Sequence, residues 1–169
     1  TAATAGSSSS IFQGDMVIPL SNGLVDVSAA DGGSVAILGV MNGCEYIDLN
    51  GKPRFDNHYP GTSAIKSGTE ATVHVYDNPN QVYEIQADAS LTDAATAQSA
   101  VHSNAEGTGF GSENGSTGKS IGELAVSTIA TTATDNFRII GIKDDFTDID
   151  VTSAGVIFLV KLNLPFHTA

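Results

Sequence analysis

The chain has 169 residues, a single cysteine and a formal net charge of −12, because 19 acidic side chains outweigh 7 basic ones. This length suits one domain with a sizeable hydrophobic core. The negative charge disfavours nucleic-acid and anionic-lipid partners, and no apolar run is long enough to cross a bilayer. The lone Cys44 excludes an intrachain disulfide, and we expect it to be packed and unreactive.

Residues 1–12 are predicted to form a flexible N-terminal arm, followed by a β domain over residues 13–169. The first ten residues read TAATAGSSSS, a composition that buries too little apolar surface to order itself. Ile11 and Phe12 follow as an apolar pair at the base of this arm. The pair packs either on its own domain or on a neighbouring molecule.

Short apolar segments separated by turn residues follow the arm. Residues 16–20 and 24–27 predict two strands, and residues 35–40 form a continuous apolar run that predicts a buried strand. Asn42-Gly43 is a strong hairpin signal, and Asn50-Gly51 predicts a second turn.

The central part of the chain carries the clearest strand pattern. Residues 71–76 and residues 83–87 each place an apolar or aromatic side chain at every second position. The residues between them, Asp77-Asn78-Pro79-Asn80, are turn formers. Together the two segments predict a long hairpin.

The C-terminal half adds further strands around a loop. Residues 90–104 are alanine-rich and predict a short helix capped by Ser90 or Thr92. Residues 105–120 predict a long glycine-rich loop, and strands are expected at residues 137–142 and 156–163. About eight short strands with turns between them indicate an all-β fold, a single-domain barrel or sandwich.

Two local patterns resemble catalytic motifs but lack their context. Gly118-Lys119-Ser120 ends like a phosphate-binding loop, yet Glu113 stands where that loop requires glycine. Residues 118–122, GKSIG, fit a nucleophile elbow by letter, but a glycine-rich loop precedes the serine instead of a buried strand. The sequence leaves open a triad assembled in space from distant residues. We expect no catalytic residues and no enzyme activity.

Metal and cofactor sites are also not indicated. Asp144, Asp145, Asp148 and Asp150 offer oxygen ligands for a hard cation, but their spacing lacks the glycine and closing glutamate of the helix–loop–helix calcium loop. An ordinary acidic loop is the favoured interpretation. The four histidines are too scattered for the usual zinc spacings. We therefore expect no cofactor and no bound metal.

Short segments spread in order over almost the whole chain carry a family resemblance. The sequence resembles tailed-bacteriophage head decoration proteins, also called capsid cement proteins. The matching segments are Phe12-Gln13-Gly14-Asp15, Ala29-Ala30-Asp31-Gly32, Gly43-Cys44-Glu45-Tyr46, Tyr59-Pro60-Gly61, Val75-Tyr76-Asp77-Asn78-Pro79, Glu84-Ile85-Gln86-Ala87-Asp88, Phe137-Arg138-Ile139-Ile140-Gly141 and Val160-Lys161-Leu162-Asn163.

This resemblance implies a non-enzymatic virion protein, made in the host cytoplasm, that binds the capsid exterior. Its partners would be the major capsid protein and copies of itself, with a trimer as the expected oligomer. We expect capsid or subunit contacts at Ile11, Phe12, Tyr59 and Phe166, with ordinary intramolecular packing as the alternative for each.

Two other function classes stay open at this point. The first is a carbohydrate- or receptor-binding module, in which Tyr46, Tyr59, Tyr76 and Tyr83 would stack on sugars. Aromatic residues on strands more often pack in the core or across strands. The second is a small hydrolase. It ranks last, because the segment around Ser120 lacks the context of a nucleophile elbow.

Overall fold

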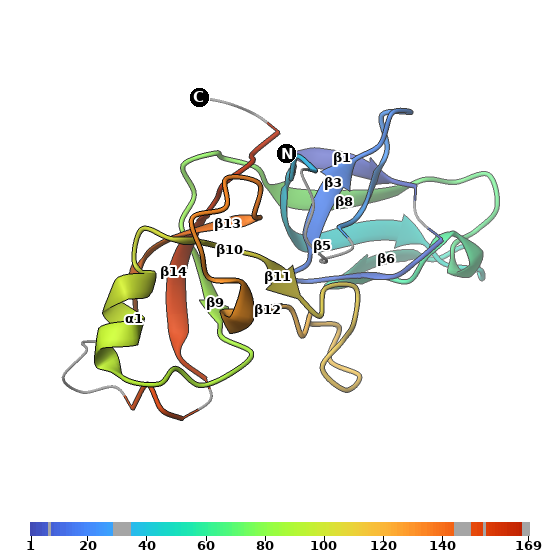
Figure 1. The fold of residues 1–169 in the computed structure, drawn as a ribbon. Helices are drawn as coiled ribbons and strands as arrows, with labels where there is room; N and C mark the ends of the chain where they lie inside the picture. Colours follow the sequence, from blue (N-terminus) through green and yellow to red (C-terminus); the bar gives the residue numbers. More distant parts are fainter. Residues whose placement is uncertain (7, 29–34, 144–149, 154, 167–169) are drawn as a thin grey trace.

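The computed structural model describes residues 1–6, 8–28, 35–143, 150–153 and 155–166. Strand residues make up 43% of it and helical residues 9%, so the prediction of an all-β fold is confirmed. Figure 1 shows two lobes side by side, each built on its own sheet, with short strands between them.

The first lobe is a closed five-stranded β-barrel. Its strands follow the order β3-β4-β1-β8-β5, and β5 pairs again with β3 to close the ring. A sixth strand, β6, extends the sheet from the far edge of β5. The bounds are β1 (Ala2–Ala5), β3 (Met16–Pro19), β4 (Val25–Val27), β5 (Gly39–Ile47), β6 (Pro53–Asp56) and β8 (Ala71–Tyr76).

The second lobe is a four-stranded sheet in the order β10-β13-β14-β9, with helix α1 beside it in Figure 1. Two small two-stranded sheets, β2-β7 and β11-β12, complete the fold. The bounds are β2 (Ile11–Phe12), β7 (His58–Tyr59), β9 (Tyr83–Gln86), α1 (Ala94–Ala100), β10 (Asn104–Ala105), β11 (Gly107–Thr108), β12 (Glu123–Leu124), β13 (Phe137–Ile142) and β14 (Ile157–Leu162), with 3₁₀ turns at Thr62–Ala64 and Val126–Thr128.

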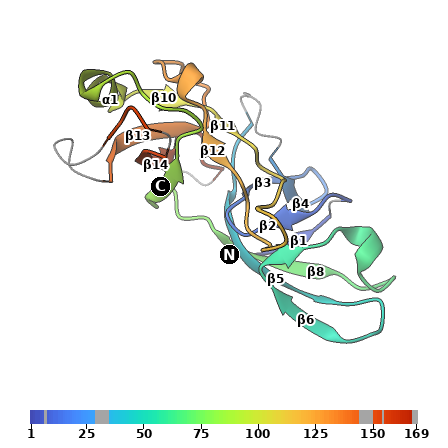
Figure 2. The same cartoon turned by 90° about the horizontal axis from the view of Figure 1, so that it is seen from below.

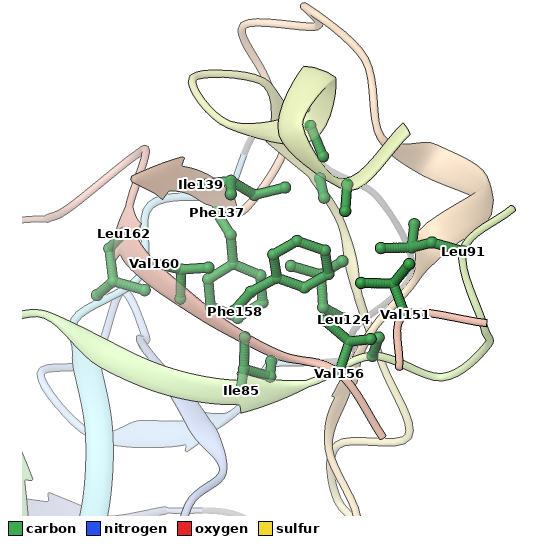
Figure 3. Close-up of a cluster of buried hydrophobic side chains, with 14 of the residues drawn as sticks. Ile85, Leu91, Leu124, Phe137, Ile139, Val151, Val156, Phe158, Val160 and Leu162 are labelled. Atoms are coloured by element: carbon green, nitrogen blue, oxygen red, sulfur yellow. The ribbon is translucent and has the colours of Figure 1, made fainter. Parts of the chain in front are cut away.

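Each lobe has its own hydrophobic core. In the barrel, Ala71, Val73 and Val75 point inward from β8 and are buried, as their period of two predicts. In the second lobe, the ring of Phe158 lies fully buried among side chains from β9, β13 and the segments near α1 (Figure 3). Removing such a ring costs on the order of 3–5 kcal/mol in protein cores, so this lobe depends on it.

The prediction of a separate arm over residues 1–12 is wrong. Residues 2–5 form strand β1, which lies between β4 and β8 in the barrel. Small side chains suit this place, because the inward-facing Ala5 is only 6% exposed against the barrel core. The backbone, not side-chain burial, orders this segment, and composition alone does not reveal such pairing.

The predicted central hairpin is also wrong, although both of its strands exist. β8 has β1 on one side and β5 on the other, so neither of its edges is open to β9. β9 instead pairs with β14 in the second lobe. The turn at residues 77–80 therefore carries the chain from one lobe to the other.

The hairpin expected at Asn42-Gly43 is absent for a related reason. β5 continues through this dipeptide, and the register with β8 shifts between Met41 and Gly43. A β-bulge of this kind absorbs one extra residue while pairing resumes on either side. The turn expected at Asn50-Gly51 is confirmed, because β5 and β6 pair as a hairpin around it. Of the strand expected at residues 35–40, only the last two residues belong to β5.

The short helix predicted within residues 90–104 is present as α1, but its cap and the structure of the glycine-rich loop differ from the prediction. α1 is capped by Asp93, whose carboxylate accepts a hydrogen bond from the Thr96 amide at 2.7 Å, and not by Ser90 or Thr92. Within residues 105–120, β11 pairs with β12. The ring of Phe110 packs against Phe137 at a centroid distance of 6.3 Å. The acidic residues Asp144, Asp145 and Asp148 lie outside the described residues.

The strand role of β1 predicts a specific effect of proline. The pairing of Thr1 with Val75, whose amide donates to the Thr1 carbonyl at 2.8 Å, sets the ladder so that the amide of Ala3 points to β8 and that of Ala2 points away. We expect Ala3→Pro to lower the free energy of unfolding by about 1–3 kcal/mol, and the control Ala2→Pro to have a much smaller effect. Denaturant melts of both variants measure this. Equal stability of Ala3→Pro and wild type would contradict the strand role of β1 and support the flexible N-terminal arm.

Candidate functional site

Two large apolar side chains protrude from the hairpin formed by β5 and β6. Phe55 on β6 is 80% exposed, and Leu49 in the turn is 66% exposed. All residues of β6 are exposed, because this strand lies outside the closed barrel. Figure 2 shows β6 at the outer edge of the barrel lobe, on the side away from β13 and β14. We call Leu49, Phe55 and the strand β6 the hairpin face.

The register places the residues around Phe55 on one outer surface of the sheet. Glu45 on β5 lies opposite Phe55 on one side and opposite Thr72 of β8 on the other. The next pair on the same face of the hairpin is Ile47 with Pro53. These residues, with Glu70, line a shallow hollow of about 210 Å³. The surface is thus an apolar strip beside two carboxylates.

The charges beside this strip are unbalanced. Within the part of the chain that the structure describes, the carboxylates of Glu45 and Glu70 take part in none of the ion pairs. Arg54, on the neighbouring position of β6, is bound to Asp48 at 3.0 Å. The Lys52 amide and, in addition, this guanidinium lower the pKa of Asp48. The hairpin face therefore presents unneutralised negative charge to a partner.

A second feature joins the two lobes and centres on a buried carboxylate. Asp15 is fully buried; its Oδ1 accepts hydrogen bonds from the Gly111 amide at 3.0 Å and from Ser120 Oγ at 2.5 Å. Its Oδ2 accepts from the Phe12 amide at 2.8 Å. Burial raises the pKa of Asp15, although these three hydrogen bonds act to lower it. The carboxylate thereby holds the glycine-rich loop against the barrel.

A cavity of about 190 Å³ lies next to this contact, between the lobes. Its lining includes Met16 from the barrel, Ile85 and Phe137 from the second sheet, and Phe110 and Ser120 from the glycine-rich loop. The lining is mainly apolar, and Ser120 is already engaged by Asp15. We find no arrangement here that would activate a bound molecule.

The hydroxyl of Ser120 is engaged by Asp15 and by the backbone next to it in the chain. Its hydroxyl donates to Asp15 and accepts from the Gly122 amide at 2.9 Å. The described histidines are engaged elsewhere or lie on the surface: His58 stacks on Phe12 at 5.1 Å, and His74 is exposed. Among the described residues no three histidine, cysteine or acidic side chains gather as a metal site.

Three of the four predicted contact residues are in the core. Ile11 and Tyr59 are opposite each other in the β2-β7 pair and are completely buried, and Phe12 is 6% exposed. Their side chains therefore pack within the chain and are not a docking surface. Phe166 is 51% exposed, and its amide donates to the Ile37 carbonyl at 2.8 Å.

The tyrosines do not form a common platform. Tyr59 is buried, Tyr46 packs partly on the barrel core, and the Tyr83 hydroxyl donates to the Tyr76 carbonyl at 2.8 Å. Only Tyr76 is largely exposed. The sugar-stacking hypothesis therefore has no cluster of aromatic rings to support it in the described residues.

Comparisons with known proteins add no relative. No family model, no curated protein and no solved structure matches the chain. Within the described residues, no helix is both long and apolar enough to traverse a lipid bilayer.

Sequence reasoning missed the hairpin face. Residues 52–61 lack a run of alternating apolar residues, so the sequence predicts no strand at Phe55. The available signal is the turn at Asn50-Gly51, which predicts a second strand after it. The register itself comes from the structure: Asp48 pairs with Lys52 around a loop at residues 49–51, which sets Phe55 opposite Glu45. Its exposure still depends on the barrel closing without β6.

The environment of Cys44 predicts low reactivity. The thiol is buried, and Sγ lies 3.2 Å from the His58 carbonyl oxygen, to which it donates. Burial, with a smaller effect from Asp56, raises the pKa of Cys44 to about 12. We expect an aromatic disulfide reagent at pH 8 to leave the native thiol unmodified and to label it at once in denaturant. Rapid labelling of the folded protein would contradict this packing.

The buried Asp15 predicts a stability loss with a defined pH dependence. Asp15→Asn places an amide N–H against a donor, so we expect it to lower the free energy of unfolding by about 1–3 kcal/mol. The folded state binds the proton of Asp15 more tightly than the unfolded chain does, since burial raises this pKa. As the pH falls from 7 through the folded-state pKa, wild type should therefore gain stability relative to Asp15→Asn, and the gain should level off below the ordinary pKa of 3.8.

Denaturant melts between pH 7 and pH 3.5 test this prediction. Ser120→Ala is the matched control, because it removes one donor and keeps the titrating carboxylate. A stability difference between wild type and Asp15→Asn that does not change with pH would show that Asp15 titrates as an exposed carboxylate.

Proposed function

We propose that this protein is a non-enzymatic structural protein of a phage virion, which binds the outside of the capsid and cements neighbouring major capsid subunits. The observation that carries the proposal is the hairpin face, where Leu49 and Phe55 protrude beside an edge strand. The family resemblance of the sequence supplies the capsid as the partner.

Exposed apolar side chains gathered at one edge favour a protein-binding role. Scattered surface apolar residues are normal, but a large aromatic ring at 80% exposure on the same short hairpin as a second exposed large apolar side chain favours a contact surface. Such side chains gain free energy when a partner covers them. The contact set of the proposal is therefore Leu49 and Phe55, with Phe166 kept from the sequence analysis.

The expected stabilisation of the shell follows from thermodynamic linkage between binding and assembly. A protein that binds only the assembled shell stabilises that shell, and contacts repeated on adjacent subunits gain from effective concentration. We extend the proposal to a symmetric oligomer of this chain, a trimer on a local threefold axis, because closed symmetry repeats one contact on several subunits. The net charge of −12 keeps copies soluble when crowded and repels packaged DNA.

The non-enzymatic part of the proposal is supported by the surroundings of Ser120. This serine came nearest to a nucleophile in the sequence, and its hydroxyl bridges Asp15 and Gly122 as part of the loop anchor. The cavity beside it is lined mainly by apolar side chains. A panel of ester substrates tests this part: turnover that disappears in Ser120→Ala would overturn it.

The capsid role predicts that decoration raises the temperature at which shells release DNA. Particles of the phage that encodes this chain are prepared with and without the protein and heated, with a DNA-binding dye as the readout. We expect decorated shells to release DNA at a higher temperature. Equal release temperatures would make the cementing role wrong.

The same particles test the hairpin face. Leu49→Asp combined with Phe55→Asp should lower occupancy at least about tenfold, because burying two carboxylates at a contact is unfavourable, while the melting temperature of the isolated protein stays unchanged. Tyr76→Asp is the matched control, since Tyr76 is 53% exposed outside the hairpin face. Full occupancy of the double variant would remove the hairpin face from the contact. Binding to a glycan array in place of shells would favour the carbohydrate-binding alternative.

A further inference from the structure

We propose that the outer edge of β6 accepts an extended, lysine- or arginine-bearing segment of a partner protein as an additional strand. The inference deepens the proposed docking role of the hairpin face and rests on it, but it does not require the partner to be a capsid protein. It names both the mode of binding, main-chain pairing, and the chemistry of the partner.

The hydrogen-bond pattern of the hairpin shows which groups face this edge. The Asp48 amide donates to the Lys52 carbonyl at 2.9 Å. In an antiparallel ladder the bonded pairs alternate, so Arg54 bonds to β5 and Phe55 does not. Ile47 and Pro53 form the next pair without mutual hydrogen bonds. The Ile47 carbonyl accordingly points away from β6 and accepts a hydrogen bond from the Lys66 amide on the other side of β5. The N–H and C=O of Phe55 therefore point away from β5, toward the outer edge.

No strand within the described ranges covers that edge, because β6 pairs with β5 alone. The edge offers the amide and the carbonyl of Phe55, together with the carbonyl of Pro53. Proline has no N–H, so Pro53 offers no donor at this edge. Unpaired edge groups of this kind are the template for strand addition. An added strand of a few residues would satisfy all three.

The charges select the partner. Proteins commonly protect short edges with proline and charged residues, and β6 carries Pro53, Arg54 and Asp56. A second copy of this chain, at −12, would bring like charge to this edge. A basic segment instead meets Glu45 and Glu70, whose carboxylates take part in none of the ion pairs of the described residues.

The side chains on the outer surface fit the same partner. An added strand would lie beside Phe55 and Pro53, and its residues on this surface would reach over the hollow of about 210 Å³. A lysine or arginine there packs its methylene groups on the ring of Phe55 and directs its charge toward Glu45. The methylene groups of the next lysine or arginine on this face, two residues along the segment, would cover the strip formed by Ile47 and Pro53.

The test uses a synthetic eight-residue peptide of alternating lysine and valine, with a glutamate–valine peptide of equal length as control. Nitrogen-15 NMR of the full chain follows amide shifts and hydrogen exchange at low salt. We expect the lysine peptide to slow exchange of the Phe55 amide at least about tenfold at saturation, since a strand partner shields it, with binding that weakens as salt is added. The glutamate peptide should have no effect.

Three variants separate main-chain pairing from simple apolar or charge contact. Phe55→Pro removes the outward N–H without removing a bond to β5, and should raise the peptide Kd at least about tenfold. Phe55→Ala keeps that N–H and should raise it by a smaller factor. Glu45→Gln with Glu70→Gln should raise it about fivefold or more. Melting temperatures confirm that each variant is folded; if Phe55→Pro fails to fold, the exchange of the wild-type Phe55 amide decides.

The outcomes also separate this inference from the capsid role. An unchanged Phe55 amide in the presence of the lysine peptide, or unaltered affinity of Phe55→Pro, would overturn strand addition. Equal protection by the glutamate peptide would overturn the selection of a basic segment. Shells decorated at full occupancy by Phe55→Pro would leave the cementing role intact and make edge pairing wrong as the mode of capsid binding. Protection of the Phe55 amide by the peptide, without any binding of the protein to shells, would support the edge site and contradict the capsid-binding role.

Discussion

The buried carboxylate of Asp15 is the interaction on which the arrangement of this protein depends. It accepts three hydrogen bonds, one from the Phe12 amide beside it in the chain and two from the glycine-rich loop, namely from the Gly111 amide and the Ser120 hydroxyl. A charge taken out of water is costly unless hydrogen bonds compensate it, so these segments stay together only as a set. The barrel, the glycine-rich loop and, through the Phe110–Phe137 contact, the second sheet are thereby joined.

The closure of the barrel leaves one strand with an open edge. The ring of strands closes between β5 and β3, so β6 is not needed for closure and remains as an appended edge strand. The cores of both lobes are complete without Leu49 and Phe55. Side chains that contribute nothing to the core but protrude into water are available for a partner. The proposed docking function and the proposed strand addition both follow from this property of the barrel.

Since the comparisons with known proteins found no match, physical features support the functional proposal. The charge of −12 argues against nucleic-acid binding. The hydrogen bonds of Ser120 argue against a role as a hydrolase nucleophile. The hairpin face argues for a protein partner. Glu45 and Glu70 beside it, which take part in none of the ion pairs of the described residues, argue for a basic one. The capsid enters only through the resemblance of the sequence, and the heating experiment on particles is therefore the decisive measurement.

The sequence by itself determined the all-β class, the inward face of β8, the turn at Asn50-Gly51 and the packed state of Cys44, because these depend on local periodicity and side-chain chemistry. Only the tertiary structure decided that residues 2–5 form a barrel strand, that β8 and β9 belong to different sheets, and that Ile11 and Tyr59 are buried while Phe55 is exposed. The physical reason is that strand partners are distant in sequence: main-chain hydrogen bonds accept almost any residue, so the pattern of one segment does not specify which segment it pairs with or which edge remains open.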